Sequence, residues 1–495
     1  MNFVLIIFVI LVGIAIYDIL QKRHSIWHNY PIIGHFRNIF ESIGSEIRQY
    51  FIENNREGLP FNRSERTYIY ASAKKENNNE GFGSDKNFND DKHFFIKNTL
   101  IIHPLPKDIT VSPKKIIGQR RLKPYQPKSF VNISGMSFGA LSGVAVEAMN
   151  KGALLADCYQ TTGEGGLSPY HCNGADVVFQ FGTGYNGVRN EDGTFSMEKL
   201  KKLVEDHPFI KMVEIKIHQG AKPGAWSILP QAKMTEEIRS VRGLSEGQDS
   251  ISPGYHTAFN DARSLVSFIE QIGNATGLPV GIKCGVGKLD EWYELAKIMK
   301  DTNLGPDYIV IDGGEGGTGS AKGSFVDHVG LPFLEAFSSV YKVFQHYHIE
   351  NTITWVGSGK LGFPAKIALA MAMGCDMVNI GREAMMSIGC IQAQQCHMNT
   401  CPTGITTNKK WKQSGLDPAL KSVRFANYLK QLQKDTMDIT AAAGYSHPSM
   451  FNTYDIDMNS NDSTNMLSLD KIYGYCKRVH NNEKFPELTQ FPFIR

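Results

Sequence analysis

The stretch DYIVIDGGEGGTG, residues 307–319, joins a short run of apolar and β-branched residues to a loop made almost wholly of glycine. The apolar residues of the run follow one another without alternating with polar ones, which is typical of a parallel strand covered on both faces. Seven further runs of this kind occur, and each is followed by a glycine-bearing or polar loop. They are FVNISG (130–135), DCYQTT (157–162), VVFQFG (177–182), MVEIKI (212–217), PVGIKC (279–284), ITWVGS (353–358) and MVNIGR (377–382).

Stretches with helical character lie between several of these runs. They cover residues 140–155, 262–272, 289–300 and 364–373. Eight strand–helix units over about 260 residues predict an α/β protein built on a (β/α)₈ TIM barrel. A doubly wound parallel sheet is the alternative architecture for the same alternation.

In a TIM barrel, functional residues lie in the loops that follow the carboxyl ends of the strands. Here those loops hold most of the unusual residues of the chain, namely 135–139, 163–166, 218–224, 313–319, 357–360 and 381–382. After strands seven and eight, the bare N–H groups of glycines and a helix N-terminus predict a phosphate site. Lys360 and Arg382 add positive charge there.

A literal dinucleotide-binding pattern also occurs in the sixth loop. Gly314, Gly316 and Gly319 match G-x-G-x-x-G after a strand. The match lies late in a long strand–helix series, and SAKGSFVDHVGLP follows it, with glycine and proline where a helix should run. We therefore predict neither a separate Rossmann domain nor an ATP-binding P-loop.

Three of the eight cysteines lie within twelve positions of the chain. Cys390, Cys396 and Cys401 have the spacing C-x5-C-x4-C, which differs from the paired cysteines of zinc fingers. Three thiolates suit a cluster of three irons with one ligand on each iron. The segment 390–401 is therefore predicted to bind an iron–sulfur cluster.

The first twenty residues predict a membrane anchor. Residues 3–16 are almost wholly apolar, and Lys22, Arg23 and His24 follow the apolar stretch. The length is near the lower limit for a spanning helix, and basic residues on the C-terminal side place the rest of the chain in the cytoplasm. We expect a single-pass membrane protein, with a buried or cleaved N-terminal helix as the alternative.

A second apolar stripe follows the anchor. Phe36, Ile39, Phe40, Ile43, Ile47, Tyr50 and Phe51 recur at helical spacing and predict a helix over 36–51. We expect this helix to pack on the main domain, and a position on the membrane surface is the alternative.

The bulk composition excludes some classes of protein. The chain has 495 residues, 42% hydrophobic and 20% charged, as a globular protein does. Lys and Arg number 52 against 49 for Asp and Glu, so that the net charge is +3. So small an excess predicts no nucleic-acid partner.

Several of these motifs together resemble a known family. The segments SGMSFGALS (134–142), TTGEGG (161–166), HQGAKPG (218–224), GGEGGTGSA (313–321) and GCIQAQQCHMNTCPTG (389–404) are similar to the FMN-binding synthase domain of glutamate synthase and to its shorter stand-alone relatives. The resemblance runs from about residue 95 to about residue 445. It implies a (β/α)₈ barrel with FMN at the carboxyl ends of the strands and a [3Fe–4S] cluster on Cys390, Cys396 and Cys401.

The resemblance also implies a reaction. In that family, 2-oxoglutarate and ammonia form an imine, and reduced FMN delivers a hydride to it. It implies that Glu164 and Lys283 are catalytic, with Glu164 at the entry of ammonia and Lys283 beside the flavin. Lys222 and Arg242 match residues that hold the dicarboxylate substrate.

The remaining correspondences concern the cofactor. The positions expected to contact FMN are Met136, Ser137, Gln219, Lys283, Gly316, Gly317, Gly357, Gly359, Gly381 and Arg382.

The chain departs from the family in two respects. It lacks the family's N-terminal glutaminase cysteine, so we expect ammonia to come from elsewhere. It also has AKPGAWSILPQ where full-length enzymes have AKPGEGGQLPG, so that Trp226 and Ile228 replace a glycine and a glutamine. A bulkier, more apolar pocket could select another oxo acid or imine.

The electron donor and the activity leave further alternatives. No NAD(P)H-binding domain is evident, so we expect ferredoxin or a separate reductase as the donor. An IMP-dehydrogenase-like barrel would need a cysteine in the loop 313–327, which has none. A membrane-tethered flavin and Fe–S electron carrier, or an FMN oxidoreductase with another substrate, remain alternatives.

The expected organisation has four parts. Residues 1–20 form the membrane anchor, 21–94 a helical and loop extension, 95–445 the FMN-binding barrel, and 446–495 a C-terminal extension.

Overall fold

The computed structural model describes residues 2–102, 111–229, 231–245, 250–459 and 466–475. It divides into two compact units, Met1–Tyr68 and Ile69–Arg495. The second unit is built on a closed barrel of eight parallel strands. The strands are β2 (Val131–Ile133), β3 (Gln160–Thr161), β4 (Val177–Phe181), β5 (Ile210–Lys216), β8 (Val280–Cys284), β9 (Tyr308–Asp312), β10 (Thr354–Ser358) and β11 (Met377–Ile380).

Each of the eight runs expected to be a strand overlaps one strand of the barrel, so the predicted (β/α)₈ architecture is confirmed. The barrel closes where β11 pairs with β2, with Val378 opposite Val131. Every residue of β4, β8, β9 and β10 is buried. Burial on both faces explains why these strands have continuous apolar sequences.

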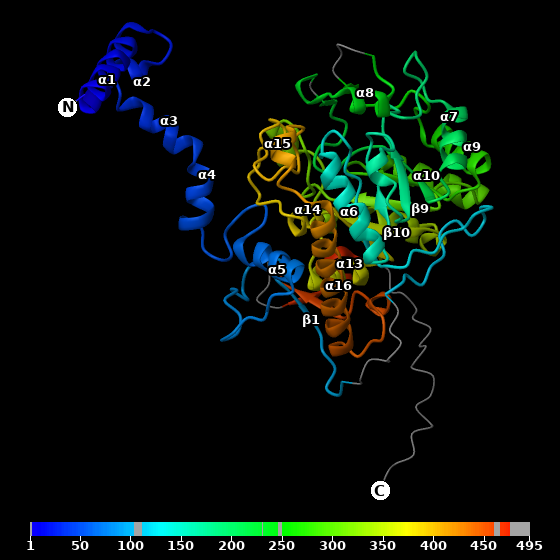
Figure 1. Cartoon of the computed structure of the whole chain (residues 1–495). Helices are drawn as coiled ribbons and strands as arrows, with labels where there is room; N and C mark the ends of the chain where they lie inside the picture. The colour runs from blue at the N-terminus through cyan, green and yellow to red at the C-terminus, as the bar shows by residue number, and fades with distance from the viewer. Residues whose placement is uncertain (1, 103–110, 230, 246–249, 460–465, 476–495) are drawn as a thin grey trace. The chain divides into compact units, whose positions relative to one another are not determined.

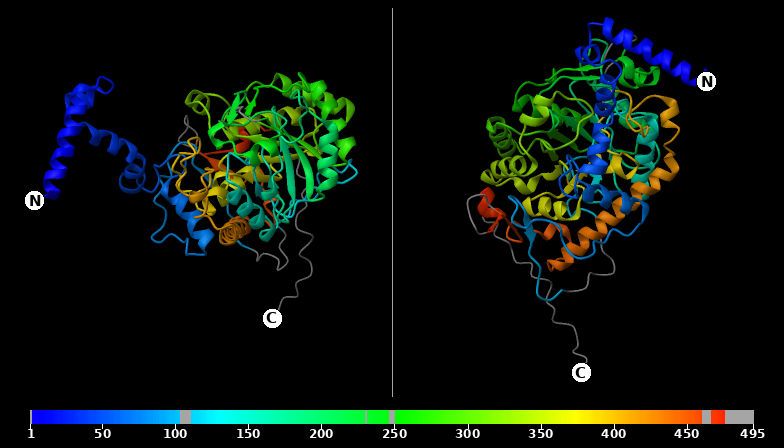
Figure 2. Two further views of the ribbon diagram at one scale, coloured as in Figure 1. Left: turned by 45° about the horizontal axis from the view of Figure 1, so that its top comes forward. Right: turned by 90° about the vertical axis from the view of Figure 1, so that its left-hand side faces the viewer.

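Helices lie outside the strands in all the views (Figures 1 and 2). They are α6 (Gly143–Leu155), α7 (Met197–Asp206), α9 (Ala262–Thr276), α10 (Asp290–Thr302), α12 (Phe333–His346), α13 (Pro364–Met373) and α14 (Arg382–Ser387). Side-chain caps fix the first residues of several of these helices. Ser142 Oγ accepts a hydrogen bond from the N–H of Ala145 at the start of α6, and Asp261 caps α9 in the same way. The four helical stretches predicted from the sequence correspond to α6, α9, α10 and α13.

One barrel position lacks its helix. Between β3 and β4 the chain forms only a 3₁₀ turn, η2 (Pro169–His171), in the fully described segment 162–176. The longest helix, α16 (Pro418–Ala442), packs along α6 (Figure 1). Four shorter elements complete the loops: α11 (Gly323–His328), η4 (Glu350–Thr352), α15 (Lys410–Gln413) and η5 (Pro448–Met450).

A small antiparallel sheet joins the two flanks of the barrel. β1 (Phe94–Ile96) precedes the barrel in sequence, and it pairs with β12 (Ile456–Met458), which follows it. β13 (Leu467–Ser468) adds a third strand, and α17 (Leu469–Tyr473) comes next.

An insertion between β5 and α9 builds one side of the barrel mouth. It contains β6 (Ser227–Leu229), η3 (Gln231–Lys233), α8 (Glu236–Arg242) and β7 (Ser250–Ser252). β6 and β7 pair as an antiparallel ribbon, with Ser227 opposite Ser252.

The first unit is helical. Its elements are α1 (Asn2–Leu20), α2 (Ser25–Asn29), α3 (Gly34–Ser42), α4 (Gly44–Ile47) and the π-helical turn η1 (Arg48–Ile52), and α5 (Arg63–Lys74) crosses the boundary between the units. The helix predicted over 36–51 is confirmed in interrupted form. α3, α4 and η1 contain every residue of the apolar stripe except Ile43, whose φ of −108° and ψ of 6° break the helix, and the turn that begins at Arg48 is π-helical.

α1 has the length and composition of a membrane span, with a mean hydropathy of 3.0 over Phe3–Leu20, which a signal sequence also has. Asp18, in its last turn, is fully buried. Its carboxylate lies 3.0 Å from Nε2 of His35 and accepts a hydrogen bond from the N–H of Ile32. Trp27 stacks on His35. These contacts fold α2 and the start of α3 back onto the end of α1.

Candidate functional site

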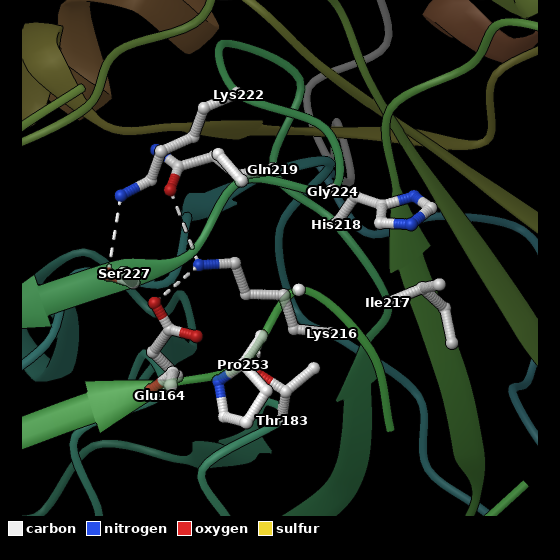
Figure 3. Close-up of a pocket in the computed structure, with 13 residues that line it drawn as sticks. Glu164, Thr183, Lys216, Ile217, His218, Gln219, Lys222, Gly224, Ser227 and Pro253 are labelled. Atoms are coloured by element: carbon white, nitrogen blue, oxygen red, sulfur yellow. Dashed lines mark hydrogen bonds and ion pairs between the residues drawn. The ribbon is translucent and has the colours of Figure 1, made fainter. Parts of the chain in front are cut away.

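A polar pocket opens at the carboxyl end of the barrel, between the strands' loops and the β6–β7 ribbon (Figure 3). The space between its walls, counted out to its open side, is about 330 Å³. The residues that line it are Glu164, Thr183, Lys216, Ile217, His218, Gln219, Lys222, Gly224, Ala225, Ser227, Ser252, Pro253 and Gly254. They come from the loops after β3, β4 and β5 and from the insertion, which is where a TIM barrel presents its functional groups.

Three polar side chains form a chain of contacts in the pocket. Lys216 Nζ lies 2.8 Å from Glu164 Oε1 and donates a second hydrogen bond to Gln219 Oε1 at 3.3 Å (Figure 3). Burial raises the pKa of Glu164, but Lys216, helped by Lys222 and Arg242, outweighs burial and lowers it below its ordinary value. Glu164 is therefore a carboxylate at neutral pH, paired with an ammonium in the pocket wall.

Lys222 faces the same pocket from the loop after β5. Its ammonium donates to Ser320 O at 2.9 Å and to Ser227 Oγ at 3.3 Å. Burial and the neighbouring Lys216 lower the pKa of Lys222, while Glu164 opposes them. Two ammonium groups beside one carboxylate leave the pocket with an excess of positive charge, which suits an anionic ligand.

Arg242 lies behind the pocket rather than on its lining. It ends α8, is 5% exposed, and donates from Nη1 to Ser250 Oγ at 2.9 Å and from Nη2 to Phe138 O at 3.1 Å. Its buried Nε has no hydrogen-bond partner among the described residues. Burial lowers the pKa of Arg242 to about 10, against the opposing effect of Glu164. The structure thus brings Glu164, Gln219 and Lys222 into one pocket and keeps Arg242 one layer behind them.

Lys283 projects from β8 into the top of the barrel. Its Nζ donates to Ser134 Oγ at 3.0 Å and lies 3.6 Å from Asp312 Oδ2. The other Asp312 contact is with the backbone, since the N–H of Gly220 donates to the same carboxylate oxygen at 2.8 Å. Lys283 is the register partner of Lys216 on the adjacent strand. The barrel top therefore holds two lysines side by side, one ion-paired to Asp312 and one to Glu164.

The glycine loops after β9, β10 and β11 meet one another. Arg382 donates from Nη2 to Glu315 O, and a Cβ on Gly317 would lie 2.7 Å from Cδ of Arg382, which leaves no room for a side chain there. Gly359 has a φ of +134°, which only glycine adopts readily, and it lies against Gly313. Gly316 bonds back to Gly313 O, and Gly357 pairs within the barrel.

The loop after β2 completes this part of the mouth. Met136 Sδ is 3.9 Å from the position that a Cβ on Gly381 would take. Ser137 lies beside Gly163, whose added Cβ would be 2.4 Å from the Ser137 nitrogen. Gln219 reaches across and donates to Gly317 O. The residues expected to contact a flavin thus lie around one end of the barrel, with Lys283 and Arg382 as its two cations.

Cys390, Cys396 and Cys401 lie in the loop between α14 and α15. Burial raises the pKa of Cys390 to about 12. Burial also raises the pKa of Cys401, but hydrogen bonds to its sulfur outweigh burial and lower that pKa to about 7. The largest of these contributions comes from Thr403, whose Oγ1 lies 3.5 Å from the sulfur. Tyr70 of α5 donates to Cys390 O at 2.8 Å and ties down the start of the segment.

Within the described part of the chain, no three His, Cys, Asp or Glu side chains converge as a single metal ion would require. A cluster of three irons sets a different requirement, because each thiolate binds a different iron and the three sulfurs stand apart. Three thiols on one loop, one of them held as an easily ionised thiol, fit that donor set.

Lys216 is a pocket residue that the sequence analysis did not single out. Its signal was present, because Glu214 and Lys216 are charged residues two apart in an otherwise apolar strand, MVEIKI. Residues two apart on a strand share a face, so both must point into the barrel or its mouth. Glu214 is buried there and accepts a hydrogen bond from Gln180.

Comparison with known proteins identifies relatives of this chain. Residues 68–446 match the family model described as a conserved region in glutamate synthase. The chain is 35% identical to the glutamate synthase large subunit-like protein YerD of Bacillus subtilis, over 94% of this chain and 95% of that protein. It is 32% identical to the archaeal glutamate synthase [NADPH] of Methanocaldococcus jannaschii, over 63% of this chain and 59% of that protein.

A third relative and a solved structure are more distant. The glutamate synthase large subunit-like protein of Rhizobium meliloti is 29% identical over 67% of this chain and 75% of its own. A crystal structure of mandelate oxidase covers 74% of the chain with a TM-score of 0.43 and 13% identity, too distant a likeness to support an argument about the site.

Proposed function

This chain belongs to the glutamate synthase family, and from that premise we propose that it is an FMN-dependent oxidoreductase that reductively aminates 2-oxoglutarate or a related 2-oxo acid. The 2-oxo acid and ammonia would condense to a 2-imino acid and water. A hydride and a proton would then reduce the imine to the amino acid. The observation on which the proposal rests is the pocket at the barrel mouth, where Lys216, Lys222 and the carboxylate of Glu164 face one another.

The pocket residues suit the two reactants. Lys222 and Lys216 offer ammonium groups to a carboxylate of the oxo acid. Glu164 stays ionised and can hold an ammonium ion or accept its proton, which ammonia must lose before it attacks a carbonyl carbon. Arg242 adds positive charge from behind and supports the same anion at a distance.

The surrounding loops fit FMN. Lys283 would face the polar edge of the flavin, and Arg382 with the glycine backbones after β10 and β11 would hold the phosphate. Gln219, Met136 and Ser137 would contact the flavin between Lys283 and the phosphate site. When bound, FMN supplies the hydride that reduces the imine carbon.

The three thiols of the cysteine segment, Cys390, Cys396 and Cys401, suit a [3Fe–4S] cluster with one thiolate on each iron. Bound there, the cluster would relay single electrons. We propose that they come from ferredoxin or a separate reductase, and that ammonia also comes from another protein or from solution.

The identity of the oxo acid depends on the rim of the pocket. Trp226 is 59% exposed, and its Cδ1 lies 3.4 Å from where a Cβ on Gly254, a lining residue, would stand. The side chain of Ile228 lies outside the described part of the structure. An indole at the rim favours an oxo acid with an apolar side chain over 2-oxoglutarate, and this observation supports the second candidate, an FMN oxidoreductase with another substrate.

We further propose that α1 anchors the protein as a single membrane span, with the barrel in the cytoplasm. Its composition supports this, as do Lys22 and Arg23 directly after it.

The test is a product assay. The protein, purified anaerobically and reduced with a viologen dye, receives ¹⁵N-ammonium and a panel of 2-oxo acids with acidic or apolar side chains, and ¹⁵N-labelled amino acids are measured by mass spectrometry. Trp226→Gly should shift the preference toward 2-oxoglutarate, while Trp411→Gly, an exposed tryptophan on α15, should not. If no member of the panel gives a product although flavin and cluster cycle normally, the chain is an electron carrier and the proposal fails.

A further inference from the structure

Lys233 is a buried lysine that the proposed reaction leaves without a role. It ends η3 in the insertion after β5 and is 5% exposed. Its Nζ donates to Cys396 O at 3.0 Å and reaches Ala140 O at 3.5 Å. These acceptors lie more than 250 positions apart in the sequence. A buried ammonium that bridges two distant loops is costly unless its contacts compensate for lost hydration.

The two loops belong to different parts of the proposed site. Ala140 follows Met136 and Ser137, the flavin-facing residues of the loop after β2, and Cys396 is the middle cysteine of the segment 390–401. The backbone of Lys233 is tied to the cysteine side as well, because Asn408 Nδ2 donates to Lys233 O. Asn408 is in turn held by Asn399, which accepts from its N–H at 2.8 Å.

Residues that follow Lys233 in the insertion also contact the loop after β2. Met234 and Ile238 form a buried cluster with Phe138. Arg242, at the end of the same short helix, donates to Phe138 O. The segment 233–242 therefore holds the flavin-side loop by packing and by two cations, and it holds the cysteine segment by one of them.

Lys233 also lies in the electric field of the cysteines. Its Nζ is 3.0 Å from the backbone carbonyl oxygen of Cys396, the middle cysteine of the segment. The ammonium therefore lies within one residue of a proposed cluster ligand, where its charge acts on whatever that cysteine binds.

We propose that Lys233 is a positioning residue that fixes the cysteine segment against the flavin-side loop and places a constant positive charge beside the iron–sulfur cluster. The inference rests on the proposed function, since the cluster belongs to it. A cluster gains negative charge when it takes up an electron, so a fixed cation nearby stabilises the reduced form and raises the reduction potential. The same hydrogen bonds keep the distance between cluster and flavin constant.

The experiment compares Lys233→Gln, Lys233→Met and Lys233→Arg in the full chain. Iron content is measured first, and the midpoint potential of the cluster is then determined by an EPR-monitored redox titration with dithionite. Lys233→Gln removes the charge but keeps hydrogen-bond donors, so it should retain iron and show a lower potential. Lys233→Arg keeps the charge and should stay close to the wild-type potential.

Lys412 provides the matched control. It too donates to a backbone carbonyl of the cysteine segment, Thr400 O, at 2.6 Å, but it is only partly buried and lies beside the Trp411 ring. Lys412→Gln should leave the potential unchanged. If Lys233→Met loses iron, the Gln and Arg variants decide the question.

Two results would overturn the inference. One is a wild-type potential in an iron-containing Lys233→Gln protein, and the other is an equal shift in Lys412→Gln. Absence of iron from the wild-type protein after anaerobic purification would be a separate failure, because it would overturn the proposed cluster itself.

Discussion

Glu164 and Lys216 form an ion pair of 2.8 Å in which neither side chain is more than 16% exposed. The carboxylate comes from the loop after β3 and the ammonium from the end of β5, so the pair spans two non-adjacent strands of the barrel. Because so little water reaches either group, each depends on the other for compensation of its lost hydration.

Removing the lysine of this pair should therefore destabilise the fold. Lys216→Met should lower the free energy of unfolding by about 3 kcal/mol at pH 7, since it leaves the buried Glu164 carboxylate without its ion-pair partner. The control is Lys211→Met on the same strand, where the lysine is more exposed and pairs with Asp176 at 4.0 Å, and it should cost less than about 1 kcal/mol. Urea denaturation of both variants measures the difference, and equal losses would contradict the role of the pair.

The same pair predicts a pH dependence. The folded-state pKa of Glu164 is below its ordinary value of 4.5, so its stabilising contribution is complete above pH 4.5 and is lost as the pH falls through the lowered pKa. In Lys216→Met the pKa should rise instead, and the penalty should shrink as acid protonates the carboxylate. Denaturation curves at pH 7 and pH 4.5 test this. A penalty that does not change with pH would count against Glu164 as its cause.

Arg382→Ala should weaken retention of FMN. It removes a charge-assisted contact to phosphate, which is worth a factor of about 10–100 in affinity. Flavin released on dilution is measured by fluorescence. Arg263→Ala, an exposed arginine at the start of α9, is the control and should retain flavin. Unchanged retention in Arg382→Ala would place the phosphate elsewhere.

Cys396→Ser should abolish the iron signal while FMN stays bound, because the glycine loops do not contain the cysteine segment. Iron and flavin are determined on the same sample. Cys172→Ser replaces an exposed cysteine outside the segment and should keep both. Full iron content in Cys396→Ser would remove that residue from the ligand set.

At the opposite end of the barrel, Arg121 should matter more for stability than its neighbour Arg120. Both bind Glu270 and Asp307, but the Arg121 side chain is 4% exposed and that of Arg120 is 33% exposed. Arg121→Met should cost about 3–5 kcal/mol and Arg120→Met about 1 kcal/mol or less. Thermal or urea unfolding orders the two, and the reverse order would be inconsistent with the burial.

Most of the barrel could be predicted from the sequence because its strands are buried on both faces. Continuous apolar runs such as YIVID then have no other stable environment, and the glycine loops after them mark the carboxyl ends. The absence of a helix after β3 also agrees with the sequence, because residues 162–176 contain four glycines and one proline and were not predicted to be helical.

Site residues could be predicted from the sequence where the residue type itself points to a function. They were harder to predict where their role depends on how the chain folds around them. A cysteine triplet stands out in the sequence. The retreat of Arg242 from the pocket lining does not, because it depends on the short helix α8 and on a hydrogen bond to Ser250 across the insertion. The break of the helix at Ile43 could not be predicted for a similar reason. The helical spacing of the apolar side chains continues across Ile43, although the backbone conformation changes there.

The pairing of β1 with β12 has a consequence for synthesis of the chain. β1 leaves the ribosome before any strand of the barrel, and its partner is made some 360 residues later. Throughout that interval the backbone groups of β1 have no strand partner and hydrogen-bond to water instead. The β1–β12 pair can therefore form only on a nascent chain whose barrel strands have all been translated.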